Sequence, residues 1–234
     1  MTRRIGLIIP SSNRMVEQEM VRHFPDGVVA HINRLRMTGP NRKPLSELLP
    51  EVEGACAELV DAKCEAVAFH CTANSMAEGS GGEAALLEAL KRANAPNVAT
   101  TSTAVMNALG ALNAKKIALV TPYSQTATEE ETHFFDEAGV EVVYMKGCDR
   151  GGSDAYCATP AEFWKAEAMA LPHKDFDALF LSCANIQCLG ILDDIEQSLG
   201  RPVITSNQVV IWETLRQIGW RGADRPQGQL FKAF

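Results

Sequence analysis

The stretch KIALVTPYSQ (residues 116–125) repeats the plan of RIGLIIPSSN (residues 4–13), which lies 112 positions earlier. Each begins with a basic residue and an isoleucine, continues as an apolar run, and ends in a proline followed by polar residues. Continuous rather than alternating apolarity is typical of a strand that is covered on both faces, as in a parallel sheet. The two stretches therefore predict equivalent buried strands in two halves of one chain.

Two further pairs of segments support the repeat. Cys71 and Cys183 each end an apolar run, in EAVAFHC (65–71) and DALFLSC (177–183), and they are also 112 positions apart. The segments ATTS (99–102) and VITS (203–206) keep the same order at an offset of 104. Three ordered matches predict two homologous halves whose cysteines occupy equivalent positions.

Short apolar runs alternate with longer amphipathic stretches along the whole chain, which predicts an α/β fold with right-handed crossovers. The expected strands are 5–10, 28–35, 65–71, 97–100, 116–122, 140–145, 177–183 and 202–206. The expected helices lie near 14–24, 45–63, 82–94, 102–113, 126–138, 160–171, 189–199 and 207–218. We expect residues 1–100, joined by 207–234, to form the first half and residues 101–206 the second. No linker rich in Pro, Gly or Ser separates them, so tight packing is expected.

Composition excludes several classes of protein. The 234 residues are 46% apolar and 22% charged, as in ordinary globular domains, and the net charge of −7 argues against nucleic acid or a membrane surface as partner. No segment approaches the roughly 20 apolar residues of a membrane helix, and the apolar run before Pro10 is so short that we expect no signal sequence there. Seven cysteines without a C-x-x-C pair indicate free thiols in a reducing cytoplasm. Neither metal-ligand spacing nor a phosphate-binding loop is present, so no metal or other cofactor is expected.

The candidate site lies where the strands end, because ligands of open α/β sheets bind beyond the carboxyl ends of the strands. Polar or reactive side chains stand at or just beyond these ends at Asn13, Cys71, Ser102, Tyr123, Cys183 and Ser206. Two thiols that face each other across one cleft suit proton exchange or conjugate addition, one as thiolate and the other as acid. Each residue taken alone also has a structural interpretation: a cysteine as a small buried hydrophobe, Asn13 as a helix cap, Tyr123 as packing.

The segments RIGLIIPSSN, HCTANSM (70–76), TTSTAVMNALGALNAKKIALVTPY (100–123) and LSCANIQ (181–187) resemble the maleate isomerase and arylmalonate decarboxylase branch of the aspartate/glutamate racemase superfamily. The resemblance implies two pseudo-symmetric Rossmann-like halves and a cofactor-free active site in the cleft between them. It implies cis–trans isomerisation of a small unsaturated dicarboxylate, maleate to fumarate. Cys71 would be the nucleophile, and Cys183 would supply and retrieve a proton. Substrate-binding groups would be Asn13, Tyr123, Thr72, Ala73, Ala184, Asn185 and Ser102.

The resemblance leaves alternatives open. The decarboxylases place Gly at the first cysteine position, so Cys71 argues against that activity, whereas amino-acid and hydantoin racemases keep both cysteines. The isomerases carry a substrate-binding Asn after the sixth strand; here MKGCDRGGSDAYC (145–157) has none, and Arg150 or Ser153 could replace that donor. A small-acid-binding protein without activity is the alternative outside the enzymes. The partner is expected to be a small carboxylate, and the protein a homo-oligomer, most commonly a dimer in this class.

Overall fold

The computed structural model describes residues 2–37, 43–172, 175–220 and 228–233, and it contains two four-stranded parallel sheets. The strand order is β2-β1-β3-β4 in the first sheet and β6-β5-β7-β8 in the second. Burial of the central strands on both faces accounts for their uninterrupted apolar sequences. The strands are β1 (Arg3–Pro10), β2 (Val28–Leu35), β3 (Ala66–Phe69), β4 (Val98–Thr100), β5 (Lys116–Thr121), β6 (Glu141–Gly147), β7 (Ala178–Leu181) and β8 (Val203–Thr205).

Helices follow almost every strand. They are α1 (Val16–His23), α2 (Leu45–Asp61), α3 (Thr72–Met76), α4 (Gly79–Arg92), α5 (Thr101–Ala111), α6 (Gln125–Glu137), α7 (Ser153–Ala158), α8 (Ala161–Met169), α9 (Leu192–Leu199) and α10 (Ser206–Gln217), with 3-10 turns η1 (Leu189–Ile191) and η2 (Gln229–Ala233). The sequence did not predict α3, α7 or η2, each of six residues or fewer, and the expected helix 189–199 begins as η1. Within the described ranges, no helix is both long and apolar enough to span a bilayer.

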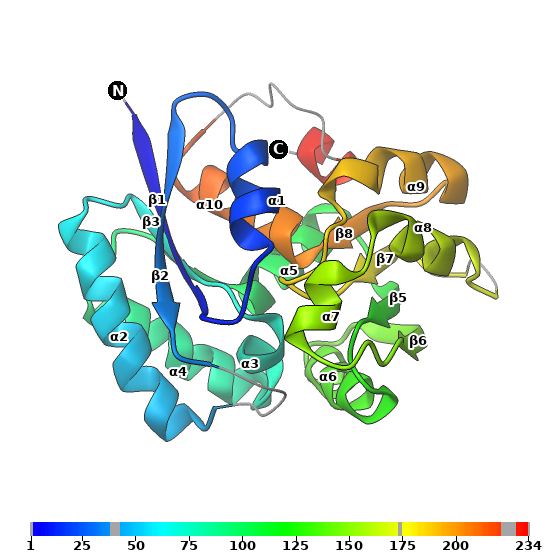
Figure 1. The fold of residues 1–234 in the computed structure, drawn as a ribbon, viewed down its shortest axis with the longest axis horizontal. Coiled ribbons are helices and arrows are strands. Elements are labelled where there is room, and N and C mark those ends of the chain that lie inside the picture. Colours follow the sequence, from blue (N-terminus) through cyan, green and yellow to red (C-terminus); the bar gives the residue numbers. More distant parts are fainter. Residues whose placement is uncertain (1, 38–42, 173–174, 221–227, 234) are drawn as a thin grey trace.

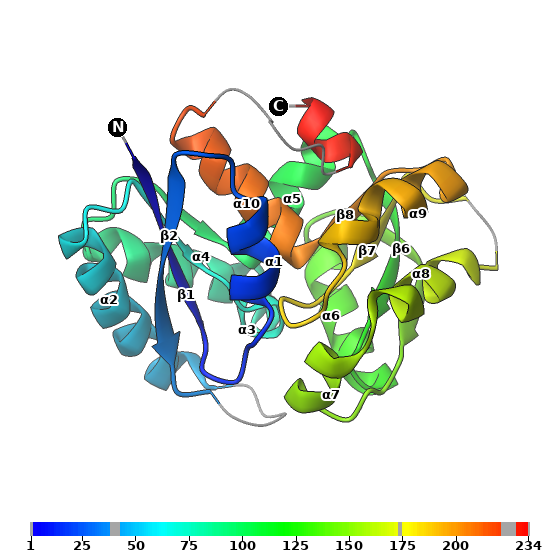
Figure 2. The same cartoon turned by 45° about the horizontal axis from the view of Figure 1, so that its top comes forward.

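The register of the two sheets confirms the two similar halves. Ile5 of β1 pairs with Ala66 of β3, and Ile117 of β5 pairs with Ala178 of β7. Each of these residues is 112 positions from its counterpart in the other half. Figures 1 and 2 show the two sheets side by side, with α1 and α10 between them.

The third sequence match is displaced by one residue in the structure. Phe69 pairs with Thr100 in the first sheet, and Leu181 pairs with Thr205 in the second, which sets the offset of these strand ends at 105 rather than 104. Both threonines cap the following helix, with their hydroxyls accepting from the backbone N–H three residues later. Ser206 therefore corresponds to Thr101 and not to Ser102. The identity of the residues alone favoured matching Ser102 with Ser206. The strand pairing and the threonine helix caps show the actual register.

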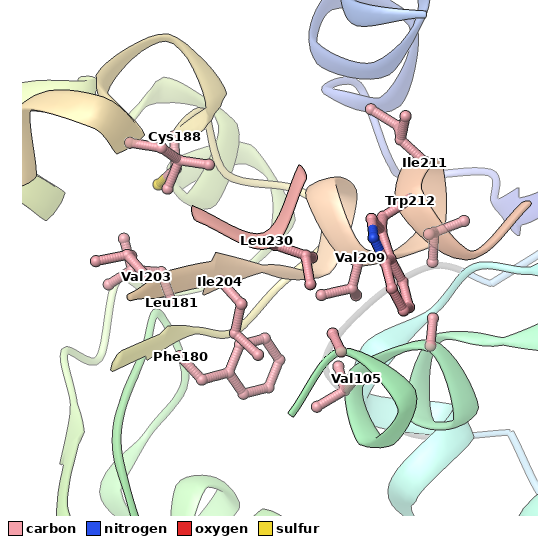
Figure 3. Packing of buried hydrophobic residues seen from close by; sticks show 14 of the residues in the cluster. Val105, Phe180, Leu181, Cys188, Val203, Ile204, Val209, Ile211, Trp212 and Leu230 are labelled. Carbon is pink, nitrogen blue, oxygen red and sulfur yellow. The ribbon is translucent and has the colours of Figure 1, made fainter. Parts of the chain in front are cut away.

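One apolar cluster joins the halves. Although α10 follows β8 of the second sheet, it packs against α5, β3 and β4. Figure 3 shows side chains from α5, β7, β8, α10 and η2 within this cluster, including Val105, Phe180 and Leu230. A polar contact reinforces the junction: the Glu19 carboxylate of α1 accepts from the backbone N–H groups of Cys188 and Leu189, at 2.9 and 2.8 Å.

Phe180 provides a test of this core. Its ring is fully buried in β7 and meets Phe135 of α6 edge-on, with centroids 6.0 Å apart. We expect Phe180→Ala to lower the free energy of unfolding by about 3–5 kcal/mol, because the cavity cannot close around a central strand. Urea denaturation measures this value. Met169→Ala, at a side chain that is 41% exposed, is the control and should stay within about 0.5 kcal/mol. A loss below about 1 kcal/mol at Phe180 would contradict the packing described here.

Candidate active site

Cys71 directly follows the short strand β3 and stands at the start of α3. Its carbonyl accepts from the backbone N–H of Ser75 at 2.9 Å, which closes the first turn of that helix. Its sulfur lies 3.7 Å from the Asn74 Oδ1 atom, and the residue is half-buried. The end of β3 thus presents this thiol at the edge of the sheet rather than inside the core.

Cys183 stands at the equivalent place after β7 but in a different environment. It is only 5% exposed, and its φ of 152° lies in a region that non-glycine residues rarely adopt. Two hydrogen bonds hold this backbone: the Cys183 N–H donates to Ser206 Oγ at 3.1 Å, and the Asn185 N–H donates to the Cys183 sulfur at 3.3 Å. An unusual conformation fixed in this way at a reactive side chain is typical of a functional site.

A hydroxyl bridge connects the segments that carry the two cysteines. Thr72, next to Cys71, donates its hydroxyl hydrogen to Ser206 Oγ at 2.8 Å, and the same oxygen accepts from Cys183 N–H. Ser206 thus forms hydrogen bonds to both cysteine turns, the segments 71–72 and 183–185 that follow β3 and β7. The thiols also influence each other electrostatically, since Cys71 contributes to raising the pKa of Cys183. The Ser206 hydroxyl therefore brings the turns of Cys71, Thr72 and Cys183 together, and the roles expected for these residues stay predictions.

The environment of Cys183 favours the protonated thiol. Burial raises its pKa to about 12, and hydrogen bonds from the Tyr123 hydroxyl and the Asn185 N–H act in the opposite direction. Burial likewise raises the pKa of Tyr123 well above its ordinary value, and Cys183 and Glu131 raise it further. Tyr123 is therefore a neutral donor beside a neutral thiol. Its hydroxyl and the Asn185 N–H are placed to stabilise a thiolate once Cys183 has given up its proton.

A buried carboxyl group lies behind Cys183. Glu131 of α6 is 3% exposed and accepts a hydrogen bond from the Ser182 hydroxyl at 2.5 Å, one residue before the thiol. Electrostatic repulsion by Glu131 contributes to the raised pKa of both Cys183 and Tyr123. The sequence did not point to Glu131, which stands within a run of three glutamates on an amphipathic helix.

Asn13 joins the start of α1 to the turn after Cys183. Its Oδ1 atom accepts from the N–H groups of Met15 and Val16 at 2.9 and 3.0 Å, which is the capping role considered from the sequence. Its Nδ2 atom donates to the Ala184 carbonyl at 2.9 Å. Because an amide carries two hydrogens, the second can still be donated to a bound carboxylate. Arg34 donates to the Asn13 carbonyl at 2.7 Å, so its charge lies at the back of this loop.

The remaining expected substrate-binding residues are held by protein contacts to different degrees. The Asn185 side chain accepts from Arg14 N–H and donates to the Ser153 carbonyl, so its backbone N–H is the group that meets Cys183. Ser102 is fully buried, and its hydroxyl bonds Thr100 and the Ser75 carbonyl, both within the first half of the chain. Ala73 is half-buried in the first turn of α3, and Ala184 is buried.

His70 is occupied elsewhere and does not act as a base for Cys71. Its Nε2 atom donates to Asn207 Oδ1 at 2.8 Å, and its Nδ1 atom accepts from the Thr101 hydroxyl at 3.0 Å. Burial lowers its pKa to about 4, so the imidazole is neutral. Among the residues that the structure describes, no group of three His, Cys, Asp or Glu side chains is placed to hold a metal ion.

Comparison with known proteins places these features in context. The sequence pattern of the family described as arylmalonate decarboxylase matches residues 5–231. The chain is 28% identical to maleate isomerase of Nocardia farcinica over 240 residues, covering 98% of this chain and 96% of that protein. It is 27% identical to arylmalonate decarboxylase of Bordetella bronchiseptica, covering 98% and 97%.

A solved structure resembles the whole fold. It is a cysteine-to-serine mutant of Nocardia farcinica maleate cis-trans isomerase with a covalently bound succinylcysteine intermediate, with a TM-score of 0.90 and 26% identity. The superposition covers 99% of this chain and 98% of that one. Unliganded arylmalonate decarboxylase gives a TM-score of 0.81 at 27% identity, covering 98% and 99%.

The pKa of Cys183 predicts a difference in thiol reactivity. A thiol with a pKa of about 12 contains, at pH 8, on the order of 10³-fold less thiolate than a free cysteine with a pKa of about 8.5. We expect iodoacetamide to label the half-buried Cys71 well before Cys183. Timed labelling followed by peptide mass spectrometry measures both rates, with the half-buried Cys157 as reference. Labelling of Cys183 as fast as Cys157 would contradict a protonated, enclosed thiol.

The pKa of His70 predicts a pH dependence of stability. Because folding lowers this pKa to about 4 from 6.5, the unfolded chain binds a proton that the folded chain does not. The stability gained from neutral His70 is complete above pH 6.5 and is lost as the pH falls toward 4, at up to about 1.4 kcal/mol per pH unit. We expect His70→Gln to remove this part of the slope in urea denaturation. His133→Gln, at an exposed position, should keep the pH dependence of the wild-type free energy of unfolding. The same pH dependence in wild type, His70→Gln and His133→Gln would contradict the lowered pKa of His70.

Proposed function

Because the chain belongs to the arylmalonate decarboxylase family, we propose that it is a cofactor-independent cis–trans isomerase that converts maleate, or a closely similar unsaturated dicarboxylate, to fumarate. The observation that carries the proposal is the pair of thiols, Cys71 and Cys183, whose turns share the Ser206 hydroxyl. Maleate isomerases among the relatives, and the succinylcysteine of the Nocardia farcinica structure, support the same reaction.

The chemistry begins with the alkene, which is electrophilic because it is conjugated to two carboxylates. The Cys71 thiolate adds to one alkene carbon and forms a carbon–sulfur bond. Negative charge moves onto the carboxylate attached to the neighbouring carbon. Cys183, kept protonated by burial, then donates its hydrogen to that neighbouring carbon. The product of these two transfers is a succinyl group on Cys71 and a thiolate at Cys183.

Rotation follows because the former double bond is now single. The Cys183 thiolate next removes a proton from the same carbon, the carbon–sulfur bond breaks, and the electron pair returns to Cys71 as the trans alkene forms. Hydrogen bonds from Tyr123 and the Asn185 N–H stabilise Cys183 while it is a thiolate. Every step therefore uses only the two thiols and neutral hydrogen-bond donors.

In this mechanism, neutral hydrogen-bond donors bind the carboxylates of the substrate. Asn13 retains a second Nδ2 hydrogen, and the neutral Tyr123 phenol can turn its single hydrogen to a carboxylate while Cys183 is protonated and back to the sulfur when it is a thiolate. We further propose that backbone groups of Thr72, Ala73 and Ala184 contribute to the same binding. The expected homodimer and the cytoplasmic location stay predictions from the sequence.

The test follows maleate by proton NMR in deuterated water. We expect wild-type protein to form fumarate, Cys71→Ser to abolish turnover and adduct, and Cys183→Ser to slow turnover at least ~10²-fold, the usual loss for a general acid. Mass spectrometry should detect the trapped succinyl adduct on Cys71 in the Cys183→Ser protein. Cys157→Ser removes a thiol outside the cysteine turns and is the matched control, with unchanged activity.

The same experiment separates the alternatives. An adduct on Cys183 would reverse the two roles, and unchanged turnover in both variants would end the two-thiol mechanism. Aryl-malonate and chiral amino acids are incubated in parallel. If maleate is inert but an α-proton exchanges, the protein is a racemase that uses the two cysteines as opposed acid and base. Loss of carbon dioxide from aryl-malonate would assign it to the decarboxylases, and binding without any conversion to a small-acid-binding protein.

A further inference from the structure

Helix α7, which the sequence did not predict, is fastened across the boundary between the two halves. The Ser153 hydroxyl donates to the Ser12 hydroxyl at 3.3 Å, and Asn185 Nδ2 donates to the Ser153 carbonyl at 2.9 Å. Arg14 forms an ion pair with Asp154 at 2.5 Å. These contacts hold α7 beside both the loop of Asn13 and the turn that follows Cys183, as its place in Figure 1 also indicates.

Residues 150–156 contain three side chains that could donate a hydrogen bond to a bound anion. Two of them already contact other protein groups. Arg150 donates to the Thr159 hydroxyl at 3.2 Å, and its guanidinium lies over the Phe163 ring, 4.7 Å from the centroid. The Ser153 hydroxyl is bound to Ser12. Arg150 and Ser153, the donors suggested by the sequence, are therefore both committed to protein contacts.

Tyr156 differs from both. Its ring meets Tyr123 edge-on, with centroids 5.7 Å apart and an angle of 69° between the planes, and both rings pack against the shared core. Burial, together with the nearby Cys183 sulfur and Asp149, raises the pKa of Tyr156 to about 12. Within the part of the chain that the structure describes, its hydroxyl makes no hydrogen bond. A neutral phenol with a donor hydrogen to offer thus lies on the Cys183 side of the site.

We propose that Tyr156 is a substrate-binding residue, whose phenol donates a hydrogen bond to one carboxylate of the dicarboxylate on the Cys183 side of the site. The inference rests on the proposed function and names a donor from α7 that completes the binding groups. Its chemistry suits the neighbouring thiol. A cation at this place would favour the thiolate of Cys183 and so remove the proton that it delivers, whereas a phenol binds the anion without adding positive charge.

Tyr156→Phe isolates the hydroxyl, because the ring and its contact with Tyr123 are kept. We expect KM for maleate to rise about tenfold or more, the usual value of a hydrogen bond to a charged group, while kcat changes far less. The affinity for succinate, a saturated dicarboxylate that cannot be isomerised, should fall by a similar factor in calorimetry. Tyr144→Phe, which removes a phenol hydroxyl from β6, is the matched control, with KM and succinate affinity unchanged.

The two readouts separate the inference from the proposed function. If wild-type protein isomerises maleate but Tyr156→Phe changes neither KM nor succinate affinity, the role of Tyr156 is overturned and the isomerase stands. A fall in kcat alone, with unchanged succinate affinity, would also overturn substrate binding by Tyr156. If wild-type protein binds succinate but leaves maleate unchanged, the isomerase proposal fails, and the calorimetric comparison still decides whether Tyr156 binds carboxylates. A protein that binds no dicarboxylate overturns both.

Discussion

The hydrogen bonds of one serine hydroxyl hold the two reactive turns together. Ser206 Oγ accepts from the Thr72 hydroxyl of one half and from the Cys183 N–H of the other. The first contact fixes the residue that follows Cys71, and the second holds the rare backbone conformation of Cys183. Ser206 is the first residue of α10, and the residue before it, Thr205, caps this helix and pairs with Leu181 in the second sheet. The position of Ser206, and with it the geometry of the two thiols, therefore depends on the second sheet.

Neutral groups dominate the surroundings of the thiol pair. Cys183, Tyr123 and Tyr156 all have raised pKa values, first because they are buried. Three arginines beside the site are directed to other partners: Arg14 to Asp154, Arg34 to the Asn13 carbonyl and Glu17, and Arg150 to the Phe163 ring. A doubly charged substrate would thus be held by dipoles rather than by salt bridges. Such an arrangement keeps a proton available on sulfur where a cationic pocket would not.

The sequence was sufficient for the architecture because the architecture depends on apolar runs and their spacing. Both four-stranded sheets, and the places of Cys71 and Cys183 after equivalent strands, were predicted in this way. The match of Ser102 with Ser206 was wrong by one residue, since it compared letters where the strand ladder decides. The assignment of residues 207–234 to the first half stays a prediction: α10 contacts β3 and β4, whereas η2 contacts α5 and β8.

Other features of the site depend on contacts between distant segments and have no local signal. Helix α7 is too short, at six residues, to show helical periodicity, so Tyr156 could not be assigned to the site. Glu131 looks like any other acid on an amphipathic helix until its contact with Ser182 is known. The φ of Cys183 likewise follows from its hydrogen bonds to Ser206 and Asn185 and not from its neighbours in sequence.

The residue before each cysteine shows how a repeated scaffold can become chemically asymmetric. His70 and Ser182 occupy equivalent positions, 112 apart, yet His70 is a neutral imidazole bound to Asn207, whereas Ser182 binds the carboxyl group of Glu131. A buried carboxyl group therefore lies behind Cys183, whereas an uncharged imidazole precedes Cys71. The backbone places the two sulfurs at matching positions, and the side chains before them give these positions different surroundings. Broken symmetry of this kind would commit an isomerase to one direction of attack, so that each turnover begins from the same face of the alkene.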